Sequence, residues 1–171
     1  MTDVILVDMD DRETGRMEKL EAHQQGKLHR AISLFIFNTK GELLLQKRAA
    51  GKYHSAGLWS NTCCSHPAPG EKTIDAARRR LREEMGISLE PVFSHHFVYR
   101  AEFGNGLTEY ELDHVYTGIF SGDPAPDPQE AQDWKYISLS ALNSDIAKNP
   151  DSYSVWLKII LQDPQFTAKH K

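Results

Sequence analysis

Histidine, cysteine and glutamate side chains recur along this sequence at spacings that suit a metal site. Cys64 and His66 alternate at the end of a short apolar run, so on a strand both side chains would point the same way. Glu109 and Glu111 stand in the same i, i+2 relation on a later run. Two earlier histidines complete three imidazoles and two carboxylates, a donor set that suits an octahedral Mg²⁺, Mn²⁺ or similar ion: His23, His29, His66, Glu109 and Glu111. The alternative is a set of scattered surface histidines and a solvated strand face.

A second cluster of charges lies on a segment with helical periodicity. Arg80 and Glu84 are four residues apart and therefore share one helix face. A diphosphate bound through a divalent cation needs this mixture, because a carboxylate holds the metal while a guanidinium holds phosphate oxygens. The competing interpretation is an exposed helix with i, i+4 ion pairs, and the helix taken alone favours it.

Two adjacent cysteines, Cys63 and Cys64, precede the Ser-His-Pro segment. Adjacent cysteines rarely form a structural disulfide, and the sequence has no second cysteine pair to build a zinc ribbon. Because neighbouring strand residues face opposite sides, we expect Cys63 to lie in the core as a small hydrophobe, away from Cys64.

The hydrophobic pattern indicates the strands that must position these groups. β-Branched and aromatic residues predict a strand over 31–37, which returns as a second strand over 42–47, so that 31–47 forms a hairpin. Two long strands, 92–101 and 109–120, flank the sequence Gly104-Asn105-Gly106, a strong hairpin signal. Shorter strands are expected over 4–7, as an edge strand, and over 58–62 and 134–137.

One helix stands out, over 73–85, with Thr73 as its N-cap and Gly86 as its terminator. Two further helices are expected over 139–147 and 153–162. This order of strands and helices predicts an α/β fold in which helices flank a mixed sheet.

Length and composition bound the class of protein. The 171 residues fit one domain, and 40% hydrophobic content supports a packed core. A formal net charge of −4 argues against a nucleic-acid binder, which needs a basic surface. No apolar run reaches the length of a membrane span, and the acidic N-terminus does not resemble a signal peptide. We expect a cytoplasmic monomer whose partner is a small molecule.

Residues 65–87 resemble the Nudix signature, a loop and helix of the form G-x5-E-x7-R-E-U-x-E-E-x-G-U, in which U is aliphatic. The matching residues are Glu71, Arg79, Leu81, Glu83, Glu84, Gly86 and Ile87. Ser65 replaces the first glycine, and Arg80 replaces a glutamate that belongs to the metal cluster of Nudix hydrolases. This replacement weakens the hydrolase interpretation and favours a site that holds a diphosphate.

A second resemblance covers most of the chain, from about residue 14 to residue 160. The block Asn-Thr-Cys-Cys-Ser-His-Pro at 61–67, the Nudix-like helix and Glu-Tyr-Glu at 109–111 are similar to type I isopentenyl-diphosphate isomerases. The resemblance implies a Nudix-like α/β/α sandwich with a mixed sheet, as one domain over 1–171 with residues 1–29 as an N-terminal extension. It also implies isomerisation of isopentenyl diphosphate to dimethylallyl diphosphate in isoprenoid biosynthesis.

The resemblance assigns ligands residue by residue. A divalent metal (Mn²⁺, Mg²⁺ or Zn²⁺) is implied at His23, His29, His66, Glu109 and Glu111. A Mg²⁺ that bridges the diphosphate is implied at Glu84, together with the backbone carbonyl of the catalytic cysteine. Phosphate contacts are implied for Lys19, Arg48, Lys52 and Arg80. The catalytic residues that it implies are Cys64, Glu111, Tyr99 and Trp156, and the remaining histidines, His54, His95, His96, His114 and His170, are left as non-ligands.

The reaction explains why such residues are needed. Moving a double bond by one carbon adds a proton at one end and removes one at the other, so two acid/base groups on opposite faces are required. We expect these to be Cys64 and Glu111, with Tyr99 orienting a proton by hydrogen bonding. The Trp156 ring would stabilise a carbocation-like state, although a core tryptophan on an amphipathic helix is an equal alternative. Residues 1–29 could cover the site and exclude water.

Two other functions remain open at this point. A Nudix hydrolase of a nucleoside diphosphate derivative would release phosphate or nucleotide. A metal-binding module without catalysis would bind metal tightly and show no turnover.

Overall fold

The computed structural model describes residues 2–170, and its centre is a mixed nine-stranded sheet. Strand β3 (His29–Phe37) runs parallel to β8 (Thr108–Ile119) along its whole length, from the pair His29 and Glu111 to the pair Phe37 and Ile119. On the other side of β8 lies β7 (Val92–Glu102), antiparallel to it. The predicted hairpin of two long strands around Gly104-Asn105-Gly106 is therefore confirmed.

The predicted hairpin over 31–47 is confirmed only at its turn. Strand β4 (Leu43–Arg48) meets β3 only at the turn, where Phe37 pairs with Leu43. Farther along, β4 pairs with β9 (Ala131–Ile137) and β5 (Trp59–Ser60), whereas β3 pairs with β8 and with β6 (Cys63–Ser65). Both apolar runs are buried on both faces, and strands of that kind need a neighbour on each side and a helical layer above and below.

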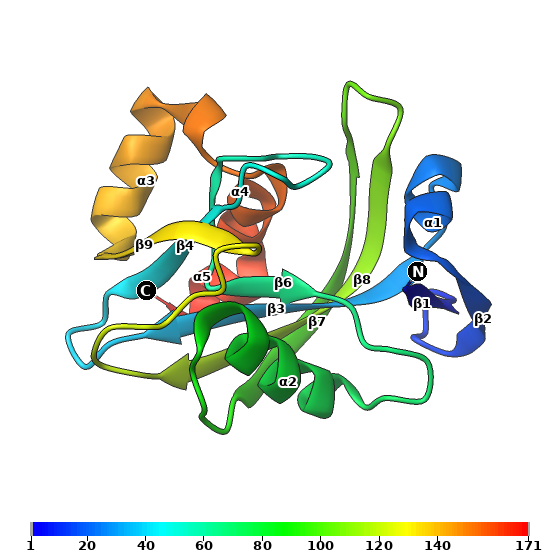
Figure 1. Cartoon of the computed structure of the whole chain (residues 1–171), viewed down its shortest axis with the longest axis horizontal. Helices are drawn as coiled ribbons and strands as arrows, with labels where there is room; N and C mark the ends of the chain where they lie inside the picture. Colours follow the sequence, from blue (N-terminus) through cyan, green and yellow to red (C-terminus); the bar gives the residue numbers. More distant parts are fainter. Residues whose placement is uncertain (1, 171) are drawn as a thin grey trace.

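Helices cover both faces of the sheet (Figure 1). Helix α2 (Thr73–Met85) packs on one face through Ala76, Ala77 and Leu81, against Leu34 and Leu44. On the other face, Phe35 and Leu45 pack against three helices: α3 (Leu139–Lys148), α4 (Val155–Gln162) and α5 (Pro164–Lys169). The predicted mixed sheet between helical layers is confirmed, and α5 is a helix that the sequence pattern did not predict.

The ends of α2 test two capping predictions. Gly86 ends the helix in the left-handed conformation (φ 67°), and its N–H donates to the carbonyl of Arg82. A Cβ there would lie 2.6 Å from the carbonyl oxygen of Ala125, so the predicted terminator is confirmed. Thr73 is not the N-cap, because Lys72 occupies that position; the Thr73 hydroxyl bonds to the Tyr116 hydroxyl instead (2.7 Å).

The N-terminal segment adds two strands to the sheet beyond β3, and a helix next to them. The predicted strand over 4–7 is β1 (Asp3–Val7), but it is not an edge strand, because β2 (Glu13–Glu18) pairs outside it. The polar sequence of β2 carries no strand pattern, which is why it was not predicted. Helix α1 (Lys19–Gln25) then returns toward β8, next to β1 in Figure 1.

This N-terminal unit is fastened to the sheet at a few points. Leu6 of β1 pairs with His29 at the start of β3. Asp11 accepts hydrogen bonds from Arg30 (2.7 Å) and lies 2.9 Å from His114 Nε2, which joins the β1–β2 turn to β3 and β8. Among the described residues, no helix has the length and apolar character needed to cross a membrane.

Candidate active site

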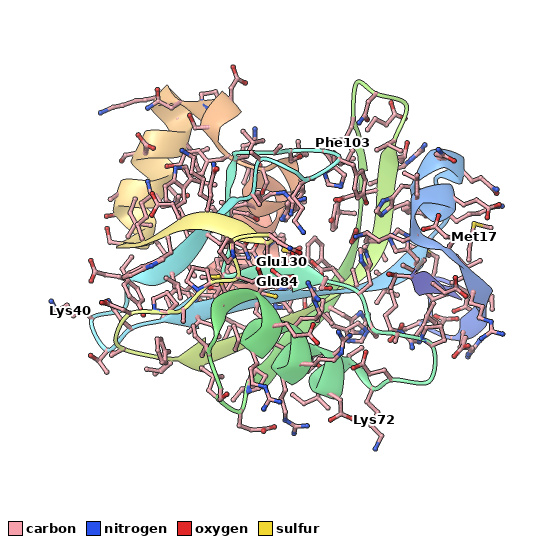
Figure 2. All side chains as sticks on the ribbon, viewed as in Figure 1. Met17, Lys40, Lys72, Glu84, Phe103 and Glu130 are labelled. Carbon is pink, nitrogen blue, oxygen red and sulfur yellow. The ribbon has the colours of Figure 1, made fainter. Side chains whose placement is uncertain are left out.

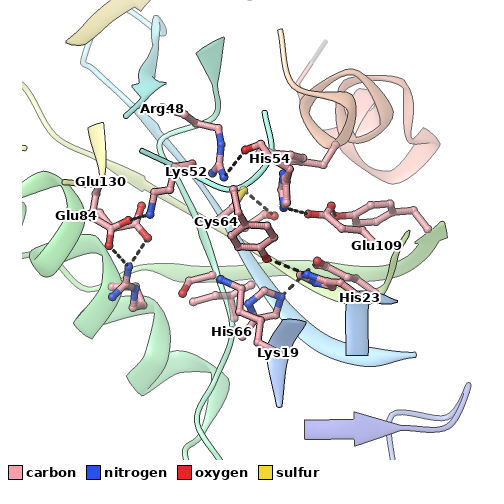
Figure 3. A pocket seen from close by; sticks show the side chains of 18 of the residues that line it. Lys19, His23, Arg48, Lys52, His54, Cys64, His66, Glu84, Glu109 and Glu130 are labelled. Atoms are coloured by element: carbon pink, nitrogen blue, oxygen red, sulfur yellow. Dashed lines mark hydrogen bonds and ion pairs between the residues drawn. The ribbon is translucent and has the colours of Figure 1, made fainter. Parts of the chain in front are cut away.

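A cavity of about 220 Å³ lies where α1, β3, β6 and the β7–β8 hairpin converge (Figure 3). Four predicted catalytic residues line it, together with the predicted phosphate-binding cations and most of the predicted metal ligands: Lys19, His23, Arg48, Lys52, Cys64, His66, Arg80, Glu84, Tyr99, Glu109, Glu111 and Trp156. His29 is fully buried behind this surface. Residues up to 137 positions apart in sequence, Lys19 and Trp156, thus share one small volume.

Four side chains come close enough to hold one metal ion. One ligand atom each from His23, His29, His66 and Glu111 lies within 4.8 Å of all the others. Strand pairing sets this arrangement: His29 and Glu111 are register partners on β3 and β8, and His66 directly follows β6. His23 reaches the group from α1, near its C-terminal end.

The histidines in this group are prepared for a metal. His29 Nδ1 lies 2.8 Å from the carbonyl of Lys27 and must donate to it, which leaves Nε2 with a free lone pair. His23 Nδ1 bonds to the Tyr53 hydroxyl (2.9 Å). Among the described atoms, the Nε2 atoms of both rings are buried and have no hydrogen-bond partner. Such orphaned acceptors beside a carboxylate fit a divalent metal.

Burial keeps the imidazoles of His23 and His66 neutral, which is the form that binds metals. It lowers the pKa of His23 to about 3 and the pKa of His66 to about 4. Burial alone would raise the pKa of the Glu111 carboxyl, but His66 and His29 hold it well below its usual range. His23 and His66 therefore present neutral nitrogen donors beside the ionised carboxylate of Glu111.

Glu109 lies outside this group of four. Its carboxyl accepts a hydrogen bond from the Tyr99 hydroxyl (2.9 Å) and lies 3.3 Å from His54 Nε2. Burial, reinforced by the charge of Glu111, raises the pKa of Glu109 well above its usual range. The pKa values of two carboxyls on one face of β8 are thus shifted in opposite directions, because histidines surround Glu111 whereas burial and the charge of Glu111 act on Glu109.

The charges on α2 form a second cluster at the other side of the cavity. Arg80 donates to Glu84 (2.7 Å) and pairs with Glu130 (3.2 Å), and Lys52 also pairs with Glu130. Glu84 is only 4% exposed, so the interpretation of this face as a solvated one is wrong. Figure 2 labels Glu84 and Glu130 next to one another near the middle of the view, while Lys40 and Lys72 lie at its outer edge.

The cations that line the cavity are suited to an anion. Burial, with Lys52 nearby, lowers the pKa of the Lys19 ammonium. Arg48 lies with its guanidinium 4.9 Å from the centroid of the Trp156 ring. Burying positive charges in a small cavity is costly unless anionic groups arrive to pair with them. Glu71 and Arg79, also in the Nudix-like segment, form a bidentate pair outside the cavity that fastens the preceding loop to α2.

The two cysteines face opposite sides of β6, as predicted. Cys63 is fully buried in the core beneath α2. Cys64 lines the cavity, where burial raises the pKa of its thiol and its Sγ lies 3.0 Å from Asn61 Oδ1 and 3.5 Å from Ser33 Oγ. Trp156 is 3% exposed, packs with Val155 and Ile159, and lines the same cavity, so it is both a core residue and a cavity wall.

Several cavity residues were not predicted as site residues from the sequence, among them Tyr53, His54 and Glu130. His54 stacks on Phe103 and its Nε2 lies 3.3 Å from Glu109, although it stands outside the four-ligand group. The one sequence feature that could have predicted His54 as a cavity residue is its position two residues after Lys52. Glu130 lies in a loop with no distinctive sequence pattern. His95 and His114 contact Asp163 and Asp11 away from the cavity.

Comparison with known proteins identifies the class. The NUDIX domain family matches residues 27–157. The crystal structure of DR0079 from Deinococcus radiodurans has the same fold, with a TM-score of 0.76 at 18% identity over 92% of this chain and 96% of that one. The α/β/α sandwich described above is therefore the Nudix fold.

Curated relatives narrow the class further. Isopentenyl-diphosphate Delta-isomerase 2 of Aromatoleum aromaticum is 56% identical over 92% of this chain and 84% of the relative. Isopentenyl-diphosphate Delta-isomerase of Serratia proteamaculans is 49% identical over 94% and 89%. The chain belongs to the isopentenyl-diphosphate Delta-isomerase family within the Nudix superfamily.

Proposed function

We propose that this chain isomerises isopentenyl diphosphate to dimethylallyl diphosphate. The observation that carries the proposal is that Cys64 shares one small cavity with the four-ligand histidine–glutamate group. A hydrolase has no use for a buried thiol there, and Arg80 occupies the place of a glutamate that Nudix hydrolases use. A nucleoside diphosphate hydrolase is accordingly not favoured.

The reaction moves one double bond and exchanges two protons. A proton adds to the terminal methylene carbon, and the positive charge develops on the branched carbon next to it. A proton then leaves the following carbon, whose C–H electrons form the new double bond, so the composition is unchanged. We assign these transfers to Cys64 and Glu111, which line the same cavity from β6 and β8.

Tyr99 is assigned an orienting role at the carboxyl pair. Its hydroxyl donates to Glu109, and burial raises the pKa of Tyr99, so the phenol keeps its proton. A fixed donor at Glu109 holds that carboxyl in place beside Glu111 on the same strand face.

The diphosphate is assigned to the cationic side of the cavity. Lys19, Arg48, Lys52 and Arg80 would bind its oxygens, and Glu84 would hold a bridging Mg²⁺. Binding energy collected there fixes the short hydrocarbon tail near the acid/base groups.

A second divalent metal, Mn²⁺, Mg²⁺ or Zn²⁺, would be held by His23, His29, His66 and Glu111, with Glu109 beside them. When bound, such a metal makes the proton of a neighbouring carboxyl more acidic, because it stabilises the ionised form. An unactivated alkene is a weak base, so the reaction needs a strong acid.

Trp156 is assigned to the developing cation. An indole face attracts a cation by about 0.5–2 kcal/mol without acting as a nucleophile that would trap it. Water would trap the cation, so the cavity must exclude it. We further propose that the chain acts as one domain over 1–171, in which residues 1–29 cover the site and carry Lys19 and His23 into it.

The test is proton NMR of the purified chain with isopentenyl diphosphate and Mg²⁺ in D₂O, with phosphate release followed in parallel. We expect the allylic isomer to appear with deuterium incorporated and no phosphate released. Phosphate or nucleotide release from nucleoside diphosphates, without any allylic product, would replace the isomerase by a hydrolase. Tight metal binding without isomerisation or hydrolysis would show that the protein is a metal-binding module without catalysis.

A further inference from the structure

The short segment that crosses from β4 to β3 buries three consecutive polar side chains. Trp59 and Ser60 pair with β4, and Cys63 to Ser65 pair with β3, so residues 60–62 make the crossing. Ser60 is 3% exposed, and Asn61 and Thr62 are fully buried. Buried polar groups need hydrogen-bond partners, so the partners chosen by each residue are informative.

The Thr62 side chain forms hydrogen bonds with backbone groups of two strands. Its hydroxyl donates to the carbonyl of Leu44 (2.6 Å) and accepts from the amide of Ile36 (3.0 Å), which ties the two diverging strands together. Ser60 and Asn61 do something different, because their side chains meet two residues assigned to the reaction.

One continuous run of hydrogen bonds joins Trp156 to Cys64. The indole Nε1 of Trp156 donates to Ser60 Oγ (2.8 Å), and Ser60 Oγ donates to Asn61 Oδ1 (3.0 Å). The Cys64 thiol donates to the same Asn61 oxygen (3.0 Å). Two residues 92 positions apart in sequence are thus connected through two intervening side chains.

The direction of every bond in this run is fixed by chemistry. Asn61 Nδ2 faces two carbonyl oxygens, of Leu34 and Cys63, each at 3.1 Å, and carbonyls can only accept. The amide cannot be flipped, so its oxygen faces Ser60 and Cys64 and accepts from both. An indole N–H is only a donor, so Ser60 must accept from Trp156 and pass its own hydrogen to Asn61.

We propose that Ser60 and Asn61 are positioning residues that set the Trp156 ring and the Cys64 thiol relative to one another. The roles of Trp156 and Cys64 rest on the proposed isomerase function, whereas the run of hydrogen bonds stands without it. Ser60 turns the indole so that its face borders the cavity, and Asn61 directs the thiol from the adjacent wall.

The backbone at the start of α4 supports the same alignment. The amide of Ser154, the N-cap of α4, donates to the carbonyl of Trp59 (2.9 Å), and this bond does not depend on the Ser154 side chain. The Ser154 hydroxyl caps the helix by accepting from the amide of Leu157 and lies 3.2 Å from Ser60 Oγ, outside the run from Trp156 to Cys64. The helix that carries Trp156 is therefore attached to the crossing segment through the backbone at Trp59, next to Ser60. The cations assigned to the diphosphate are not part of this run, so its loss should affect the chemical step more than substrate binding.

The kinetic test compares Ser60→Ala with Ser60→Thr and with the control Ser154→Ala. Ser60→Thr keeps a hydroxyl, while Ser154→Ala removes a neighbouring buried hydroxyl and weakens the helix cap but leaves the run unbroken. We expect Ser60→Ala to lower kcat about tenfold with KM within about twofold, since one hydrogen bond is at stake. Ser60→Thr and Ser154→Ala should stay within about threefold of the original kcat. An equal loss in Ser60→Ala and Ser154→Ala would overturn the proposal.

A double-variant cycle separates positioning from general destabilisation. Trp156→Phe keeps an aromatic ring but has no N–H for Ser60 to accept. If Ser60 acts through Trp156, Ser60→Ala should lower kcat far less in the Trp156→Phe background than in the unaltered chain. If the fold-loss of kcat in the double variant equals the product of the two single fold-losses, Ser60 does not act through the indole.

A spectroscopic test needs no substrate and stands apart from the isomerase assignment. In the ¹⁵N-labelled protein, the Trp156 indole N–H resonance should shift in Ser60→Ala but return near its original position in Ser60→Thr. The infrared S–H stretching band that Cys64→Ala removes should move in Asn61→Ala, or in Asn61→Asp should Asn61→Ala not fold. If neither the Trp156 indole resonance nor the Cys64 S–H band moves, the run of hydrogen bonds is refuted. If both move but the chain does not isomerise its substrate, only the proposed function is refuted.

Discussion

Cys63 and Cys64 are adjacent in the chain, yet their sulfur atoms belong to different parts of the protein. Cys63 lies in the core between β6 and α2, and Cys64 lies in the cavity wall. The pleat of a three-residue strand is enough to separate a packing residue from a chemical one.

Replacing each cysteine by alanine should therefore give opposite results. We expect Cys64→Ala to abolish isomerisation with the fold intact. Cys63→Ala should keep most of the activity and lose about 1 kcal/mol of stability, because it leaves a small void in the core. Turnover by NMR and thermal unfolding of both variants make the comparison. Equal loss of activity in both would contradict the assignment.

Metal should stabilise the folded protein through the four-ligand group. Mn²⁺ at about one hundred times its dissociation constant should raise the melting temperature of the chelator-treated protein by about 5–10 °C. His23→Ala should remove most of that increase, because the ion loses one ligand. His96→Ala, which changes an exposed histidine, is the matched control and should behave like the unaltered chain. Calorimetric titration with each protein checks the result, and an undiminished shift in His23→Ala would place the metal elsewhere.

Asp113 should make stability fall as the pH rises. Burial, with the charge of Glu111, raises the pKa of Asp113 to about 8 from its ordinary value of 3.8, and Ser33 donates to its carboxyl at 2.6 Å. The folded state holds a proton that the unfolded state has released. The stability linked to this group is therefore complete below pH 3.8 and is lost as the pH rises toward 8.

Asp113→Asn should remove that dependence, because an amide stays neutral and can keep the bond from Ser33. Relative to the unaltered chain, the variant should gain up to about 1.4 kcal/mol per pH unit between pH 5 and 8. Urea unfolding of the metal-free proteins across this range measures the difference. Parallel stability curves for the two proteins would show that Asp113 is ionised in the fold.

The proposed cover formed by residues 1–29 can be tested by hydrogen exchange. Metal and an unreactive diphosphate analogue should slow exchange of the amides in β1, β2 and α1, because Lys19 is proposed to bind the diphosphate and His23 the metal. Asp11→Ala should speed exchange there, since it removes the contacts to Arg30 and His114. Asp10→Ala, whose carboxylate is exposed, is the control. Unchanged protection on adding both ligands would disprove the cover.

Local signals explain what the sequence could predict. Helix α2 has a continuous apolar stripe and a glycine end, and the β7–β8 hairpin has a glycine-asparagine turn, so each is specified by its own residues. The pairing of β3 and β4 is not local, because the burial of both strands recruits β8 and β9 from far along the chain. β2 is polar and forms a strand only because β1 lies beside it.

The same distinction holds for the site. Paired residues such as Glu109 and Glu111 could be found by their alternation, and Cys64 and His66 by their short motif. Tyr53 and His54 come from a loop whose path depends on the cavity it borders. No periodicity in the sequence predicts that these two residues line the cavity. Thr73 shows the opposite case, in which a local signal gave a wrong prediction. Thr73 is a good capping residue, but its hydroxyl bonds to Tyr116 because β8 offers a partner at that point.

The strand register has a consequence for how this protein can change length during evolution. His29 of β3 and Tyr99 of β7 are the register partners of Glu111 on its two sides, so the pairing of three neighbouring strands fixes the position of this carboxylate. Deleting one residue at the start of β8 could shift the register of that strand by one position. The Glu111 side chain would then point to the other face of the sheet. Insertions at the Gly104-Asn105-Gly106 turn would leave that pairing untouched. Lineages of this chain can therefore lengthen the turn freely, while the strands on either side must keep their residue count.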